Sequence, residues 1–382
     1  MTEGNHHNLE IRPLGDFFET IEAGLLQQHE HLAILPLLTF GEAGAVPPAF
    51  VSLAEALAAG SFTVDEVSEH GSVPKIRARN SGNVAVLVLF GEELVGAKQN
   101  RVANASFLVV AHSNVDLDVS CVEAGRWGRR PGERFEESHE VVSSELRKKM
   151  AHSVKTSRDR SGGFNADQGE VWNEVADRMQ RSRVHSPTGA YADYSENWKG
   201  HVDTASRTFD VVERQVGFVA LRPAAGERPA RVLGVEAVGR PDAFAKAFPK
   251  LLRSYVVDSV DAGLRKDTDR ARAATPGFTD PVAFLREISD ADFRLSRSLG
   301  GGQDLRLDGE VVSGCALLRG GVVHLTAFPF ERPGRSGGRP RTDRIRPEVR
   351  GEVEQSQRRA AFGLDEQLRR VRERRRALEE EE

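Results

Sequence analysis

"VAVLVLFGEELVGAKQNRVANASFLVVA", residues 84–111, places a polar segment between two apolar stretches. The apolar stretches 84–90 and 105–111 predict two buried strands, and the polar residues between them predict a connection that faces a ligand. Lys and Arg suit phosphate or carboxylate groups, while Gln and Asn suit amides or ribose hydroxyls. The candidate residues of this segment are Glu93, Lys98, Gln99, Asn100 and Arg101.

Other interpretations of this segment stay open. It is also compatible with a solvated hairpin loop, or with an ion pair between Glu93 and either Lys98 or Arg101. A Walker A phosphate loop is excluded by the spacing. That motif needs Lys directly after its second Gly, whereas Ala97 separates Gly96 from Lys98.

A second candidate segment is "VDLDVSCVEAGRW", residues 115–127. Apolar and polar residues alternate through 115–121, which predicts a strand with one solvent-exposed face. Cys121 shares the apolar face, so a buried, inert thiol is expected rather than a nucleophile. Glu123, Arg126 and Trp127 follow the strand, and a charged pair beside an indole suits a planar ligand. The alternative is a Trp that covers the edge of the core with the Arg stacked on it.

Each polar segment follows a predicted strand, and only a short stretch of chain separates the two strands. Antiparallel pairing is therefore expected to bring 91–101 and 120–127 together at one site.

The rest of the sequence carries weaker chemical signals. His29 and His31 alternate as strand residues do, but two His without a third ligand give little support for a metal, and no Cys/His zinc spacing is present. No metal and no cofactor is predicted. The Gly-containing stretches 186–194 and 299–309 are expected to be turns, with backbone contacts to a ligand as the alternative. No Ser/His/Asp arrangement can be distinguished from chance.

The overall pattern predicts an α+β fold with a mainly antiparallel sheet and segregated packing helices. Helical spacing covers 136–154 and 165–181, with a mobile polar loop expected at 155–165. A long amphipathic helix is predicted over 240–260. Alternating apolar residues predict hairpins at 216–239 and 309–328.

Three regions are predicted along the chain: an N-terminal α/β region, 1–83, packed on the core; a main α+β domain, 84–331; and a tail, 332–382. The tail holds 15 Arg against 11 acidic residues, a net charge of +4, so the remainder of the chain carries −8. An Arg-rich linker precedes apolar residues that fill two heptads at most. The tail is expected to form a solvated charged helix, or to bind another copy or a polyanion.

Composition indicates a soluble cytoplasmic protein. The chain has 382 residues, of which 39% are hydrophobic and 29% charged, and its net charge is −4. Two distant cysteines argue against a disulfide framework and favour a reducing compartment. No secretory signal is recognisable, and the apolar run 32–40 is far shorter than the ~20 residues of a membrane span.

The motif "GEELVGAKQNR…SCVEAGRW" resembles the ARG and rhodanese-phosphatase-superfamily-associated protein domain family. Supporting similarity continues through "ADQGEVWNEV", "SPTGAYADY", "QVGFVAL", "FPKLLRSYVVDSV" and "VHLTAF", and so covers residues 85–328. The family is named for neighbouring genes that encode ADP-ribosylglycohydrolases and rhodanese-like phosphatases. The resemblance implies a role close to ADP-ribose or NAD-derived nucleotides, in bacterial defence or repair.

The leading hypothesis is a protein that binds an anionic nucleotide-like ligand in a pocket built from 91–101 and 120–127. If the protein is an enzyme, Glu93 is the expected general base and Lys98 the charge stabiliser, in a hydrolysis or transfer. The expected ligand-binding residues are Gln99, Asn100, Arg101, Glu123, Arg126 and Trp127. The rival hypothesis is a non-catalytic sensor or protein-interaction module, whose tail contacts a partner or a second copy. Nucleic-acid binding through the tail is a weaker alternative.

Overall fold

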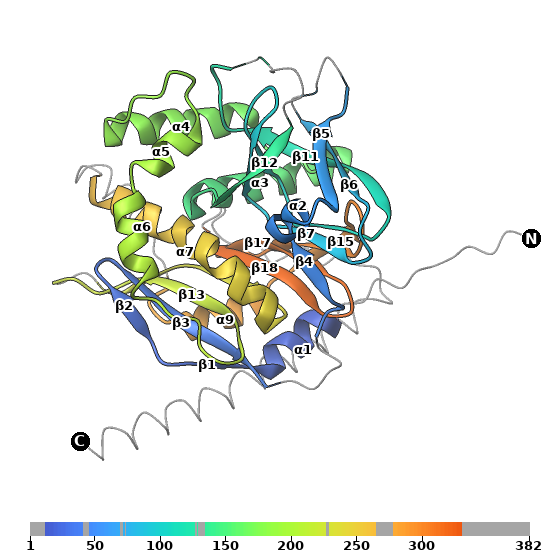
Figure 1. Cartoon of the computed structure of the whole chain (residues 1–382). Helices are drawn as coiled ribbons and strands as arrows, with labels where there is room; N and C mark the ends of the chain where they lie inside the picture. Colours follow the sequence, from blue (N-terminus) through green and yellow to red (C-terminus); the bar gives the residue numbers. More distant parts are fainter. Residues whose placement is uncertain are drawn as a thin grey trace, which may run out of the picture.

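A computed structural model describes residues 12–40, 46–68, 72, 74–126, 128, 134–226, 229–264 and 278–330. Within these residues the fold is α+β, as predicted: the helices pack on three sheets whose strand pairs are almost all antiparallel (Figure 1). The predicted tail, 332–382, lies outside the described residues. No helix in the described ranges is long and apolar enough to cross a membrane.

Nine antiparallel strands form the largest sheet. Their order is β1 (Ile21–Ala23), β3 (Leu32–Thr39), β13 (Gln215–Arg222), β14 (Arg231–Val238), β18 (Val322–Pro329), β17 (Val312–Leu318), β16 (Gln303–Asp308) and β15 (Phe293–Arg297), with β2 (Gln27–His29) paired to β3. Both predicted hairpins are confirmed, as β13–β14 and β17–β18. Residues from the N-terminal region thus share one sheet with residues from the end of the main domain.

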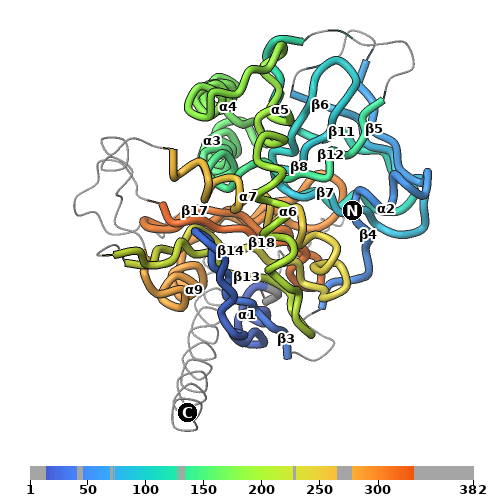
Figure 2. Tube along the Cα trace, turned by 60° about the vertical axis from the view of Figure 1, so that its left-hand side comes forward, coloured from blue at the N-terminus to red at the C-terminus, as the bar shows by residue number. Residues whose placement is uncertain are grey.

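Helices cover both faces of this sheet (Figure 2). The long predicted helix is α7 (Pro241–Leu264), whose Phe248 ring packs edge-on against Phe218 of β13, with ring centroids 5.8 Å apart. The other face is covered by α1 (Arg12–Thr20) and α9 (Pro281–Asp290). Two separate apolar clusters result, one on each side of the sheet.

The stretch 84–111 contributes two strands to each of the other two sheets. Its apolar ends are the antiparallel neighbours β7 (Ala85–Val88) and β10 (Phe107–Val109), and β4 (Phe50–Ser52) pairs with β7 in parallel. A capping box at Ser52 starts α2 (Leu53–Ala58). The polar segment between β7 and β10 forms a separate hairpin within a six-stranded sheet. The order of that sheet is β12 (Phe135–Val141), β8 (Glu92–Gly96), β9 (Arg101–Ala103), β11 (Ser113–Cys121), β6 (Lys75–Asn80) and β5 (Phe62–Glu66).

Four further helices pack beside these sheets: α3 (Ser144–Ser161), α4 (Gln168–Ser182), α5 (Tyr191–Glu196) and α6 (Lys199–Ser206). The helix predicted from 136 was wrong in its first part, because strand β12 pairs with β8 and α3 starts only after the Ser143 cap. The loop predicted at 155–165 was wrong for 155–161, which are helical, whereas 162–165 do lie between two helices. Helix α3 continues to Ser161, since its polar side chains bind other elements; Arg158, for example, lies 4.1 Å from the centre of the Phe164 ring.

Candidate functional site

The candidate site is built on the β8–β9 hairpin, in which Glu93 lies opposite Val102. Its turn depends on two residues in the left-handed region, Gly96 with φ 110° and Ala97 with φ 43°. A Cβ on Gly96 would lie 2.5 Å from the carbonyl oxygen of Arg134. Both the backbone conformation and the lack of space therefore require glycine at position 96.

This turn meets the end of β11, so the two predicted polar segments do converge. The backbone N–H of Asn100 donates to Glu123 Oε2 at 3.0 Å, and Gln99 Nε2 donates to the Glu123 carbonyl at 2.9 Å. Between them, the Val122 N–H donates to the carbonyl of Asn100 at 3.1 Å. The prediction of antiparallel convergence is confirmed.

Arg126 holds the two segments together. Its Nε donates to Glu123 Oε1 at 2.9 Å, and its other N–H groups donate to the carbonyls of Gly96, Ala97 and Gly128 and to Asn100 Oδ1. A guanidinium has five N–H donors, and all five are directed at acceptors of this loop. Burial opposes ionisation of Glu123, but hydrogen bonds from Arg126 and Asn100 outweigh it and lower the pKa of Glu123.

Arg101 and Glu93 occupy opposite faces of the hairpin, because they are one residue out of register. Arg101 is fully buried and points toward β5, where its Nη2 lies 3.9 Å from Glu66 Oε1. Burial lowers the pKa of Arg101. Lys98 is half-buried in the same turn, and its backbone N–H donates to Glu66 Oε1 at 3.4 Å. The remaining predicted residue, Trp127, lies outside the described residues.

Glu93 is the candidate residue with free hydrogen-bonding capacity. Its side chain is fully buried, Asn100 Nδ2 donates to its Oε1 at 3.5 Å, and its Oε2 has no hydrogen-bond partner within the described residues. Burial, reinforced by the negative charge of Glu140, raises the pKa of Glu93 to about 8. A carboxyl group with such a pKa can both give and take a proton near neutral pH.

Glu140 was missed by the sequence analysis, which placed it on a helix. It lies in a bulge of β12, between Glu137 and Val141, where His139 has φ 60°. Glu140 forms an ion pair with Arg253 of α7, in which Glu140 Oε1 lies 2.6 Å from Arg253 Nη2. Burial raises the pKa of Glu140, although the charge of Arg253 opposes the shift. Two carboxyl groups thus share one side of the hairpin.

The stretch 186–194 borders the same site. The Gly125 N–H donates to the Thr188 carbonyl at 2.7 Å, and Ala190 forms a β-bridge with Glu123. A Cβ on Gly125 would lie 2.9 Å from the Thr188 oxygen, so this approach depends on glycine. The other glycine-rich stretch, 299–309, lies elsewhere: its Gly301 N–H donates to Leu108 of β10.

The described side chains contain no group of three His, Cys, Asp or Glu residues that is arranged to hold a metal ion. The site is instead a carboxyl pair beside a hydrogen-bonded loop. Its chemical capacity is proton transfer and the acceptance of hydrogen bonds.

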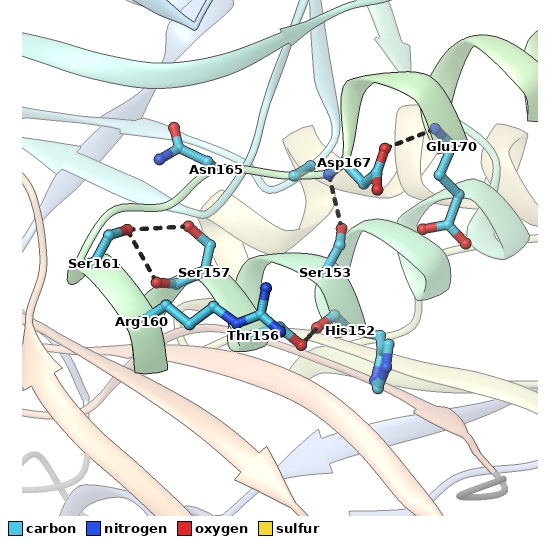
Figure 3. Close-up of a pocket in the computed structure, with 10 residues that line it drawn as sticks. His152, Ser153, Thr156, Ser157, Arg160, Ser161, Asn165, Asp167 and Glu170 are labelled. Carbon is cyan, nitrogen blue, oxygen red and sulfur yellow. Dashed lines mark hydrogen bonds between the residues drawn. The ribbon is translucent and has the colours of Figure 1, made fainter.

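A shallow groove of about 440 Å³ lies between α3 and the start of α4 (Figure 3). Hydroxyl groups line it, and several bond to their own helix, as Thr156 does to the His152 carbonyl. Asp167 caps α4 through the N–H of Glu170. None of the predicted site residues lines this groove.

A Ser–His–Glu cluster, which sequence spacing does not reveal, lies in the core. Ser106 Oγ is 2.7 Å from His324 Nδ1, and His324 Nε2 is 3.5 Å from Glu236 Oε2. Glu236 Oε1 accepts hydrogen bonds from Arg147, Tyr255 and Thr326. These side chains are at most 4% exposed, and their hydrogen bonds join the sheets.

Comparisons with known proteins agree with the motif. The family model described as "ARG and Rhodanese-Phosphatase-superfamily-associated Protein domain" matches residues 20–328. Searches of curated proteins and of solved structures give no significant match. The matched region includes all three sheets and every candidate residue, so the chain belongs to the ARG and rhodanese-phosphatase-superfamily-associated protein domain family.

Proposed function

We propose that this protein binds a nucleotide-like ligand, ADP-ribose or an NAD-derived group, at the Glu93 site and acts on it by hydrolysis or transfer. The observation that carries the chemical part is the buried Glu93 carboxyl group, whose pKa is raised to about 8. The ligand class rests on the motif resemblance, and the same resemblance suggests a setting in bacterial defence or repair.

In this proposal Glu93 is the proton-transfer group. At neutral pH it holds its proton, so it acts first as a general acid on the leaving group and then, once ionised, as the general base expected from the sequence. Lys98 stabilises negative charge on the ligand from the turn of the same hairpin. Gln99, Asn100, Arg101, Glu123 and Arg126 keep the loop in the shape that the ligand meets.

Binding and turnover test the proposal separately. Isothermal titration with ADP-ribose, NAD and inorganic phosphate is expected to give binding of the nucleotides and none of phosphate alone. Incubation with each nucleotide, followed by chromatography, is expected to give products with the wild-type chain. Glu93→Gln should abolish product formation while preserving the fold. Glu170→Gln, on the separate α3–α4 groove, is the matched control and should behave as wild type.

The rival, a non-catalytic sensor, has one observation in its favour. The polar groups of Gln99, Asn100 and Arg126 are bonded within the loop, an arrangement that suits rigid recognition. If the wild-type chain bound a nucleotide but formed no product, the sensor function would be supported. If the wild-type chain bound neither ADP-ribose nor NAD, both proposed functions would be wrong.

A further inference from the structure

We propose that Glu93 and Glu140 together receive the vicinal diol of a ribosyl group, and that the phosphates of the ligand lie away from this carboxyl pair. This inference rests on the proposed function and specifies which part of the nucleotide meets the two acids. It reverses the simplest expectation for an anionic ligand, in which a phosphate would occupy the centre of the site.

The side-chain donors of Arg126, Gln99 and Asn100 are already used within the loop. Arg126 directs its N–H groups at loop carbonyls, at Glu123 and at Asn100. The side-chain amides of Gln99 and Asn100 donate to the Glu123 carbonyl and to Glu93. A phosphate presents only acceptors, so it would have to break these hydrogen bonds to bind here.

One carboxyl oxygen of Glu93 and one of Glu140 remain open. Glu93 Oε2 and Glu140 Oε2 are both buried, and neither has a hydrogen-bond partner in the part of the chain that the structure describes. A buried polar atom without a partner is costly, and it is satisfied by a group that donates a hydrogen bond. The open oxygen of Glu140 therefore calls for a donor, and the open oxygen of Glu93, when it carries the proton, calls for an acceptor.

Ser138 holds the two glutamates side by side. Ser138 Oγ donates to the Glu93 carbonyl at 3.1 Å and accepts the Glu140 N–H at 3.3 Å. These two hydrogen bonds fix the bulge of β12 against β8 and bring Glu140 next to Glu93. Arg253 then fixes the Glu140 carboxylate from α7 at 2.6 Å.

The two carboxyl groups differ in their surroundings. Arg253 pairs with Glu140, whereas Glu93 has no such ion pair among the described residues, and its pKa of about 8 keeps it protonated at pH 7. The pair therefore offers a donor, the Glu93 hydroxyl, and an acceptor, Glu140 Oε2. Two adjacent hydroxyl groups, each of which donates and accepts, fit this combination, and a dianionic phosphate does not.

The decisive comparison is between two sugar phosphates that differ only in one hydroxyl group of the diol. Isothermal titration at pH 7 would use ribose 5-phosphate, 2-deoxyribose 5-phosphate, adenosine and pyrophosphate with the wild-type chain, Glu140→Gln and the control Glu170→Gln. Loss of one hydroxyl partner of a buried polar group is expected to weaken binding roughly tenfold or more. Glu140→Gln should weaken the binding of ribose 5-phosphate by a similar factor. It should leave the affinity for 2-deoxyribose 5-phosphate unchanged.

Three outcomes would overturn the inference: equal affinity for the two sugar phosphates, tighter binding of pyrophosphate to Glu140→Gln than to wild type, or no binding of any diol-bearing probe. Failure of the proposed function looks different. In that case no phosphate-bearing probe binds, yet adenosine, which is uncharged, binds to wild type and is weakened by Glu140→Gln. Such a result would retain the diol site and reject the nucleotide assignment.

Discussion

The side chain of Arg147 passes directly beneath Gly91, so closely that a Cβ on Gly91 would lie 2.3 Å from Arg147 Cδ. Gly91 also has φ 81°. From this position Arg147 reaches into the core and donates to Glu236 Oε1 at 2.7 Å. The first glycine of the motif therefore lets a buried ion pair connect the hairpin that carries Glu93 to the large sheet.

Gly91→Ala is expected to be strongly destabilising. Steric conflict with Arg147 adds to the backbone strain of a positive φ, and together these should lower the free energy of unfolding by about 3 kcal/mol. Gly162→Ala is the matched control, because Gly162 also has a positive φ, 73°, but an added Cβ meets nothing within 4 Å. Urea denaturation of both variants measures the difference. Equal losses would show that the space beneath Gly91 does not matter.

The ion pair between Arg147 and Glu236 should be costly to break. Both side chains are fully buried, so Glu236→Gln leaves an uncompensated guanidinium and is expected to cost about 3–5 kcal/mol. Glu196→Gln removes an exposed ion pair with Lys199 and should cost less than about 0.5 kcal/mol. Chemical denaturation compares the two variants. A loss below 1 kcal/mol for Glu236→Gln would refute the structural role given to this cluster.

The fold class and the hairpin partners were predictable because strand alternation and helix periodicity are local signals. The structure of residues 136–143 was not predictable, because the apolar side chains of Val141 and Val142 fit a helix face as well as a strand end. Pairing with β8 decides between the two, and that pairing is a long-range property. The same error concealed Glu140.

The convergence of the two polar segments was predictable from the strand order, but the role of each side chain was not. Arg126 follows a strand end as a ligand-binding Arg would, yet its N–H groups are directed at loop carbonyls. Asp118 was expected on an exposed face and is buried, because it accepts hydrogen bonds from Lys75 and from the Phe164 N–H. Hydrogen-bond partners from distant segments decide such roles, and no local pattern contains them.

Deletion of 332–382 is expected to leave the melting temperature nearly unchanged. The strand that precedes this tail, β18, is paired on both sides, by β14 and β17, so the sheet is complete before the tail begins. Light scattering should show a reduced apparent mass, or a partner should bind less tightly in a salt-dependent manner, since the tail carries +4. Differential scanning calorimetry provides the check on folding. Unfolding of the truncated chain would place the tail in the core.

Both cysteines are expected to be structural. Burial raises the pKa of Cys121, and it raises that of Cys315 to about 11, so neither thiol is activated as a nucleophile. Cys121 Sγ also donates to the Glu123 carbonyl at 3.2 Å. Ellman's reagent should react with neither thiol in the folded chain and with both after unfolding. Cys121→Ala should cost about 1 kcal/mol of stability and preserve nucleotide binding. Rapid labelling of the native protein would contradict this assignment.

The raised pKa of Glu93 predicts how stability depends on pH. In the unfolded chain this group ionises near its ordinary value of 4.5, whereas in the folded chain it ionises near 8. Between these values the folded state holds a proton that the unfolded state has released, so stability falls as pH rises, by up to about 1.4 kcal/mol per pH unit. Glu93→Gln removes this ionisable group. The variant's stability should therefore vary less with pH between pH 5 and pH 8.

Glu123 gives a control of opposite sign on the same loop. Its pKa is lowered, so its contribution to stability is present above the ordinary carboxyl pKa and is lost as pH falls through the folded value. Glu123→Gln should therefore reduce stability at neutral pH and weaken the acid dependence, without changing the slope between pH 5 and pH 8. Denaturation at half-unit pH steps measures all three chains. If Glu93→Gln kept the wild-type slope in that window, Glu93 would be ionised in the folded protein, and its assignment as a proton donor at neutral pH would be wrong.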